Sequence, residues 1–359
     1  TLQGPVKKRI LAARNAFNRN GPRGTVLITN YEALLNKGFM DFLMQDFKPA
    51  IVVLDEIHKI KNPQSKRFKA CIKIGDKAEL RYGLTGSPIL RNQMDLYTQF
   101  RFVDKGETFG KSFTEFKYKY FIDTNAGMPK NSYFPNWKFR PSMSTELSEK
   151  IGSMSMSVVK SECLDLPPLV KQKVFVTMAP DQKRAYKEMS RDLVTFIRDR
   201  KDDVNKPAVA SMTLTKTLRL MQIASGFASV ENEGEENTNV IFEKNPKADA
   251  LQEILEQHAI GRKIIVWAIF KEDYKAVARV FKKLDIKYVE VHGGISAKNK
   301  DKAVEDFNND ETVRAFLGHP KAGGIGINLT ISDLQVFFSR GFSLEDDMQS
   351  EARNYRGGS

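Results

Sequence analysis

Short apolar runs alternate with stretches of helical period along most of the chain. In the first half, β-like runs lie at 25–29, 51–54 and 80–85, and helical patterns lie at 31–35, 39–47, 65–74 and 93–103. In the second half, β-like runs lie at 264–269, 288–291, 313–317 and 334–338, and helical patterns lie at 272–284, 297–307 and 346–353. Strands that alternate with helices form βαβ units, so the pattern predicts an α/β fold with parallel sheets flanked by helices. The runs at 25–29 and 51–54 are apolar enough to predict buried strands.

The middle of the chain has a different character. Aromatic and basic residues are frequent from about 110 to 159 without a clear period, a β-like run follows at 170–176, and helical patterns lie at 181–198 and 208–227. We therefore expect two α/β lobes separated by a largely helical insertion. The expected parts are a first lobe at 1–162 with a protrusion at about 110–159, a helical segment at 163–246 and a second lobe at 247–359.

Composition narrows the class of protein. A chain of 359 residues exceeds one ordinary domain. Its 57 Lys and Arg against 44 Asp and Glu give a net charge of +13, which favours a polyanionic partner. The longest apolar run, Ile264 to Phe270, is too short to span a membrane, and two cysteines exclude a disulfide framework. We expect an intracellular protein in the cytoplasm, nucleoid or nucleus. Since the chain starts at Thr1 without Met, we also expect a fragment.

Acidic and small polar residues follow two of the predicted strands. Asp55 and Glu56 come directly after the run at 51–54, with His58 close behind. Adjacent carboxylates at a strand end suit a magnesium nucleotide site, where one holds the metal through water and the next activates an attacking water. An acidic helix N-terminus is the alternative interpretation. Thr85-Gly86-Ser87-Pro88 ends the third strand and suits either a phosphate-sensing segment or an ordinary turn.

Two segments near the C-terminus suit phosphate contacts. Three glycines in the run 322–329, including Gly324 and Gly326, allow backbone N–H groups to approach a phosphate, although a hinge would use the same residues. Arg353 and Arg356 lie on one helical face and suit the terminal phosphates of a nucleotide, although a solvated basic face is the common alternative. The segment 106–112 reads G-x-x-x-G-K-S, one residue short of a phosphate loop, and follows a helical pattern, so we reject it.

Taken in order, these segments resemble the Swi/Snf-type ATPases of helicase superfamily two. The resemblance spans nearly the whole chain. It rests on VLITNYEALL (26–35), IVVLDEIHKIKNPQS (51–65), LRYGLTGSPILRNQMDLY (80–97), CLDLPPLVKQKVFVTMAPDQKRAYKEM (163–189), KIIVWAIF (263–270), VHGGIS (291–296), HPKAGGIGINL (319–329) and QSEARNYRGGS (349–359).

The resemblance implies a pair of RecA-like lobes with ATP and Mg²⁺ in the cleft between them. By matching position, Asp55 would hold the metal through water and Glu56 would activate the attacking water. Arg353 and Arg356 would act as arginine fingers. The remaining matched residues of the nucleotide site are Gln349, on the same helix as the arginines, and Gly324 and Gly326, in the loop that links nucleotide to DNA.

The resemblance further implies a motor that translocates on double-stranded DNA, usually without separating the strands. We expect a monomeric motor that remodels protein–DNA complexes or acts in repair or recombination, with a DNA-bound protein complex as a further partner. The residues that would couple the nucleotide to DNA are His58, Thr85, Gly86 and Ser87. The residues that would contact DNA are Thr29, Asn30, Tyr31, Arg91, Asn92, His292, Gly293, Gly294, His319 and Lys321.

The chain departs from the family pattern in ways that leave alternatives open. Ile57 replaces a small residue, Tyr355 stands where a His is common, and the Arg356-Gly-Gly-Ser ending differs from Arg-Ile-Gly-Gln. The phosphate-loop motif, which would precede residue 1, is absent, so we expect the 359 residues alone to turn over no ATP. The alternatives are a non-catalytic DNA-binding relic and a strand-separating helicase of the same superfamily.

Overall fold

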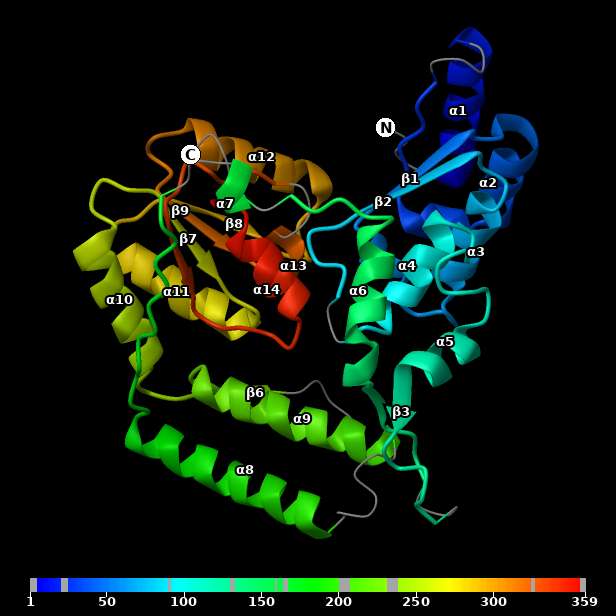
Figure 1. Cartoon of the computed structure of the whole chain (residues 1–359). Coiled ribbons are helices and arrows are strands. Elements are labelled where there is room, and N and C mark those ends of the chain that lie inside the picture. The colour runs from blue at the N-terminus through cyan, green and yellow to red at the C-terminus, as the bar shows by residue number, and fades with distance from the viewer. Residues whose placement is uncertain are drawn as a thin grey trace. The chain divides into compact units, whose positions relative to one another are not determined.

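A computed structural model gives the fold as two compact units, residues Thr1–Met156 and Ser157–Ser359 (Figure 1). In the part of the chain that the structure describes, no helix combines the length and apolarity that crossing a membrane requires. The described residues are 5–20, 25–89, 92–129, 133–158, 160–163, 167–199, 207–230, 238–323 and 327–355.

The first unit is built on a pair of parallel strands. Strand β1 (Ile51–Asp55) pairs with β2 (Leu80–Leu84), and Asp55 is opposite Leu84. Helix α3 (Lys66–Gly75) connects them and begins at Ser65, whose hydroxyl accepts the Phe68 N–H at 3.1 Å. The predicted βαβ alternation is therefore confirmed here. The expectation of full burial at 51–54 is wrong, because Ile51 and Val53 are exposed.

Helices and an antiparallel pair of three-residue strands complete the first unit. One hydrophobic core contains Leu54, Ile60 and Phe102, together with side chains from the helices at 6–20, 31–35, 37–42 and 66–75. A second core, rich in aromatic side chains, gathers Tyr97 and Phe116 with Phe121. The stretch at 110–159 thus contains regular structure that its sequence did not indicate. The further elements are α1 (Val6–Asn20), η1 (Tyr31–Leu35), α2 (Lys37–Phe42), η2 (Leu43–Phe47), η3 (Ile57–Ile60), α4 (Asp95–Val103), α5 (Phe113–Tyr120), β3 (Phe121–Asp123), β4 (Trp137–Phe139), η4 (Pro141–Met143) and α6 (Ser144–Gly152).

Two predicted strands are wrong. Residues 25–29 have no regular secondary structure, and Val26 is 83% exposed. Residues 170–176 likewise have none, and Phe175 is 92% exposed. Strand propensity describes how well a side chain fits a pleated surface beside its neighbours. An apolar run with no adjacent strand therefore remains irregular.

The second unit contains a four-stranded, wholly parallel sheet in the order β10-β7-β9-β8. Its strands and helices agree with the sequence-based prediction to within two residues at most ends. The elements of this sheet and its helices are β7 (Ile264–Trp267), α11 (Lys271–Lys283), β8 (Tyr288–Val291), α12 (Ala297–Asn309), β9 (Ala315–Gly318), α13 (Pro320–Gly323), β10 (Leu334–Phe337) and α14 (Leu344–Glu351).

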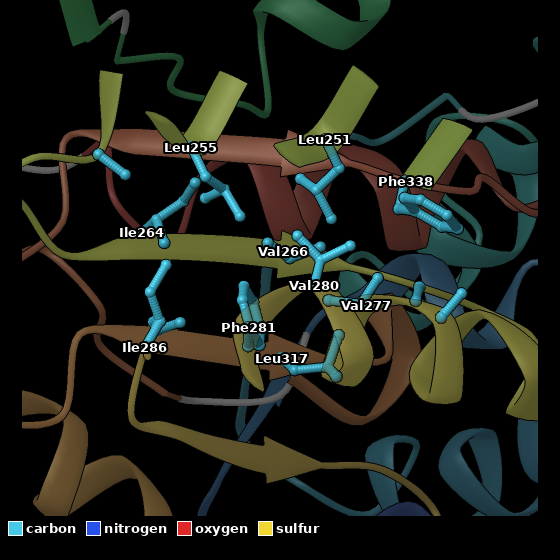
Figure 2. Close-up of a cluster of buried hydrophobic side chains, with 14 residues drawn as sticks. Leu251, Leu255, Ile264, Val266, Val277, Val280, Phe281, Ile286, Leu317 and Phe338 are labelled. Carbon is cyan, nitrogen blue, oxygen red and sulfur yellow. The ribbon is translucent and has the colours of Figure 1, made fainter. Parts of the chain in front are cut away.

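Helices cover both faces of this sheet. On one face, Leu251 and Leu255 of α10 (Pro246–His258) reach toward Ile264 and Val266 of β7, and Phe281 of α11 packs in the same cluster (Figure 2). The other face carries a second cluster that includes Trp267 of β7, Phe307 of α12 and Phe316 of β9. The residues of β7 therefore alternate between two cores, which explains why its sequence is apolar throughout.

The rest of the second unit is mainly helical. Helices α8 and α9 pack against each other (Figure 1), and Gln182 of α8 donates its side-chain N–H to the Ile223 carbonyl of α9 at 2.6 Å. Strands β5 and β6 form an antiparallel pair. These elements are α7 (Lys160–Cys163), α8 (Pro180–Asp199), α9 (Pro207–Ala224), β5 (Phe227–Val230), β6 (Thr238–Ile241) and α10 (Pro246–His258).

Candidate functional site

The acidic pair lies at the carboxyl end of β1, where the strand turns sharply. Asp55 is the last strand residue, and its Oδ1 accepts the Glu56 N–H at 3.0 Å. Glu56 has φ 52° and ψ 52°, a left-handed conformation that costs a non-glycine residue roughly 1–2 kcal/mol. The Tyr31 hydroxyl donates to the Asp55 carbonyl at 2.7 Å. These contacts fix the backbone that carries both carboxylates.

His58 connects the acidic strand end to the end of β2. Its ring is 2% exposed, and Nδ1 lies 2.8 Å from Oγ1 of Thr85 and 3.2 Å from Oε2 of Glu56. The Thr85 hydroxyl oxygen also accepts the Ser87 N–H at 3.1 Å. The structure therefore brings Glu56, His58, Thr85 and Ser87 into one polar cluster. Gly86 lies between Thr85 and Ser87 and is exposed.

Ile57, the departure from the family's acidic box, is buried against a glycine. A Cβ atom at Gly83 would lie 2.5 Å from Cδ1 of Ile57, closer than any side chain tolerates. The large residue at 57 is accommodated because β2 has no side chain at 83. This pair was not identified from the sequence. A glycine inside a strand can nevertheless indicate that another part of the chain approaches the strand backbone closely.

The residues expected to contact DNA in the first unit have mostly local partners. The Asn30 side chain accepts the Ala33 N–H at 3.2 Å and so caps η1, and the Asn92 side chain accepts the Met94 N–H at 2.9 Å. Tyr31 is half-buried between Asp55 and Arg67, and burial raises the pKa of its hydroxyl. Thr29 is also half-buried. Arg91 lies outside the described residues.

The rejected phosphate-loop look-alike at 106–112 is occupied by a carboxylate of the chain itself. Asp104 accepts the Gly106 N–H at 2.7 Å through Oδ1 and the Thr108 N–H at 2.8 Å through Oδ2. Gly106 has φ 87°, and a Cβ there would lie 2.9 Å from the Gly110 carbonyl oxygen. Ser112 caps α5 by accepting the Glu115 N–H. Two backbone amides of this segment therefore already have an anionic partner within the chain.

In the second unit, the end of α14 contacts the segment that follows the glycine-rich run. Arg353 is buried, and its Nη1 donates to the Ile327 carbonyl at 3.3 Å. The Leu329 N–H donates to the Arg353 carbonyl at 3.2 Å. Gln349 is half-buried on α14. The expected residues Gly324, Gly326 and Arg356 lie outside the described residues.

Charged contacts attach the segment at 167–171 to the end of α14. Glu351 accepts hydrogen bonds from Lys171 Nζ at 2.6 Å and from Arg340 Nη2 at 3.1 Å. Partial burial acts to raise the pKa of Glu351, but these two cations lower it overall. The Tyr355 hydroxyl donates to the Pro167 carbonyl at 3.0 Å. The end of the helix that carries Gln349 thereby contacts the segment at 167–171.

Two histidine segments come together beyond the ends of β8 and β9. The His319 N–H donates to the Val291 carbonyl at 3.0 Å, across neighbouring parallel strands. Nδ1 of His292 accepts the Gly294 N–H, and Nδ1 of His319 accepts the Lys321 N–H, each at 3.1 Å. Burial lowers the pKa of His319, so its ring favours the neutral form. Gly293, Gly294 and Lys321 are exposed at this edge.

The oxygen donors at the end of β1 fit a magnesium nucleotide better than a metal held by protein alone. Asp55 and Glu56 supply adjacent carboxylates, the ligand type that Mg²⁺ prefers. In the part of the chain that the structure describes, no three His, Cys, Asp or Glu side chains form a metal-holding group. Mg²⁺ commonly keeps water and phosphate oxygens beside one or two carboxylates, which is what this strand end offers.

Two family models and several known proteins match this chain. The SNF2-related domain matches residues 9–228, and the helicase conserved C-terminal domain matches residues 246–358. Chromodomain-helicase-DNA-binding protein 1-like of Danio rerio is 25% identical over 98% of this chain and 32% of its own length. Putative protein p41 of Acyrthosiphon pisum secondary endosymbiont phage 1 is 24% identical over 96% of this chain and 69% of its own length.

Among solved structures, the chain is similar to the Sulfolobus solfataricus SWI2/SNF2 ATPase core in complex with dsDNA. The two are 26% identical, with a TM-score of 0.40 and coverage of 86% of this chain and 61% of the other. The chain thus spans about a third of the Danio rerio relative and well over half of the phage protein.

Proposed function

The chain belongs to the SNF2-related family of helicase-like, DNA-dependent ATPases in superfamily two, and on this premise we propose that it is the core of a motor that translocates on double-stranded DNA. The observation that carries the proposal is the acidic strand end, where His58 links Glu56 to Thr85. Such a motor would move along duplex DNA without separating its strands and displace or remodel a DNA-bound protein complex.

At the nucleotide, each group of the chain has a proposed role. When bound, magnesium ATP would supply the phosphoanhydride and the electrophilic metal. Asp55 would hold that metal through water, and Glu56 would orient a water molecule and accept its proton. Arg353 and Arg356 neutralise the charge that develops on the terminal phosphates. Gln349 and the glycines Gly324 and Gly326 shape the surroundings of those phosphates.

The coupling of hydrolysis to DNA is proposed to run through the polar cluster of His58 and Thr85. A displacement of Glu56 would reach the end of β2 through two polar contacts of His58 Nδ1, at 3.2 Å to Glu56 Oε2 and 2.8 Å to Thr85 Oγ1. Gly86 and Ser87 continue that path into the following turn. Because the DNA contact must be independent of sequence, backbone phosphates are the expected target. The proposed DNA-contact residues are Thr29, Asn30, Tyr31, Arg91, Asn92, His292, Gly293, Gly294, His319 and Lys321.

The 359 residues contain no phosphate-loop sequence, so we propose that they hydrolyse no ATP by themselves. The test uses a protein in which this chain is joined to a phosphate-loop segment. We expect duplex DNA to stimulate ATP hydrolysis and ATP to drive displacement of a third strand from a triplex. Displacement of one strand of a plain duplex would indicate a strand-separating helicase instead.

A non-catalytic DNA-binding role is the second candidate, and the lack of a phosphate-loop sequence among the 359 residues favours it. In that case the chain would bind duplex DNA, yet the joined protein would show neither hydrolysis nor triplex displacement. Measurement of both activities beside DNA binding separates the two functions.

A further inference from the structure

Helix α3 carries a row of lysines that none of the roles above uses. Lys66, Lys69 and Lys73 follow i, i+3, i+7 spacing, and Lys77 lies in the turn after the helix. Residues at this spacing share one helical face. All four side chains are exposed. We refer to Lys66, Lys69, Lys73 and Lys77 as the lysine face.

The opposite side of α3 holds the helix in place. Cys71 and Ile74 are buried, and Phe68 and Ile72 pack against the same core. Burial raises the pKa of the Cys71 thiol to about 12, as expected for a side chain in an apolar core. Because these residues fix the rotation of α3, the lysine face points to solvent.

The charges around α3 leave the lysine face strongly positive. Within Lys66–Gly75 four residues are basic and none is acidic. The neighbouring Asp76 binds Arg101 through both oxygens, at 3.0 and 3.1 Å. Arg67 of the same helix binds Glu32 at 2.7 Å. Among the described residues, no carboxylate forms an ion pair with a member of the lysine face, so its charge is available to a ligand.

We propose that the lysine face is a further DNA-binding surface, which holds the phosphate backbone of a duplex apart from the motif residues named above. Lys66 and Lys73 lie about 10 Å apart along the helix axis, at 1.5 Å per residue. A duplex offers one phosphate about every 1.7 Å along its axis, so a straight row of lysines meets several phosphates whatever the sequence. Flexible ammonium groups suit such a line of charge, whereas recognition of a planar carboxylate favours arginine.

Like the proposed function, this inference has duplex DNA as the ligand, but it does not require ATP hydrolysis. Each lysine–phosphate contact releases about 0.9 of a counterion. Each contact therefore makes the slope of log K against log salt more negative by about 0.9. The experiment therefore measures binding of the 359-residue chain to a fluorescent duplex by anisotropy at several salt concentrations. The test variant replaces all four lysines of the lysine face by glutamine.

A matched control removes the same charge elsewhere. Helix α11 carries four exposed lysines, and their replacement by glutamine also lowers the net charge from +13 by 4, to +9. A second control replaces the lysine face by arginine and keeps its charge. Circular dichroism checks that each variant is folded. The four control lysines are Lys271, Lys275, Lys282 and Lys283.

We expect replacement of the lysine face by glutamine to reduce the magnitude of the slope of log K against log salt by about 2–4. The α11 variant should change that magnitude by less than about 1. The arginine variant should retain most of the slope. Equal losses in the two glutamine variants would mean that only net charge matters and would overturn the proposal. Retained duplex binding with lost binding to poly-glutamate would overturn it in favour of an acidic protein partner. Failure of the unmodified chain to bind duplex would remove the DNA-binding part of the proposed function as well.

Discussion

Ile57 occupies the space that a side chain at residue 83 would fill, since a Cβ on Gly83 would lie 2.5 Å from its Cδ1. The two residues belong to η3 and β2, on either side of the acidic strand end. A bulky residue next to the carboxylates is thus matched by an empty position on the neighbouring strand. The Ile57 side chain therefore lies directly against the backbone of β2 at Gly83.

Substitution of the pair should show strong coupling. Gly83→Ala should lower the free energy of unfolding by about 1–3 kcal/mol through overpacking, and Ile57→Ala by about 2–5 kcal/mol through cavity formation. The double variant should cost less than the sum by about 0.5–3 kcal/mol, because each change relieves the other. Urea unfolding measures all three. Gly86→Ala is the control, since a Cβ there meets nothing within 4 Å; additive effects at 57 and 83 would contradict the pairing.

Thr85→Val should weaken the contact between the two strand ends. Valine has nearly the same shape but removes the oxygen that meets His58 Nδ1 at 2.8 Å and the Ser87 N–H at 3.1 Å. We expect a loss of about 1–3 kcal/mol in unfolding free energy, because the buried His58 ring loses one of its polar contacts and the Ser87 N–H loses its acceptor. Thr85→Ser keeps the hydroxyl and should recover most of this loss. Equal stability of the valine and serine variants would show that the hydroxyl is unimportant.

Glu56→Gln should separate binding from hydrolysis. In the protein joined to a phosphate loop, we expect turnover to fall by about 10²–10⁴-fold, since the amide cannot accept a proton from water. Affinities for ATP and duplex DNA should change little. Glu79→Gln, which removes an exposed carboxylate of the same unit, should leave turnover intact. A Glu56→Gln protein that hydrolysed ATP at the normal rate would exclude the proposed role of Glu56.

Acid should weaken the contact of α6 with α5 through Glu146. Hydrogen bonds from Lys119 and Tyr120 lower the pKa of Glu146 to about 2, from 4.5. A lowered pKa means that the stabilisation is complete above about pH 4.5 and is lost as the pH falls toward 2. Glu146→Gln should flatten the fall of the unfolding midpoint across this window, measured by circular dichroism. Glu149→Gln on the same helix should keep the slope; an unchanged slope at Glu146 would contradict the assignment.

The sequence predicted the strands and helices of the second unit well because each has a strong period and a clear boundary. Ser296 and Ser343 cap α12 and α14 through their side chains, and β7 is apolar on both faces because it lies between two cores. Such signals are local, so neighbouring residues suffice to identify them. The strand predicted at 25–29 failed since ladder formation depends on a partner strand, which no local pattern reveals.

The positions of the candidate site residues were partly predictable for the same reason. The positions of Asp55 and Glu56 at a strand end follow from the apolar run before them, and that placement is confirmed. The left-handed backbone of Glu56 and the contact of Arg353 with the Ile327 carbonyl depend on packing between distant segments. Neither has a signature in the surrounding residues.

The carboxylate of Asp104 acts as a built-in substitute for a bound anion. Because it saturates the backbone donors of Gly106 and Thr108, the neighbouring Lys111 has no cradle to share. Affinity reagents derived from ATP should therefore leave Lys111 unlabelled. A sequence motif at 106–112 would otherwise place the nucleotide about fifty residues away from Asp55 and Glu56 at the end of β1.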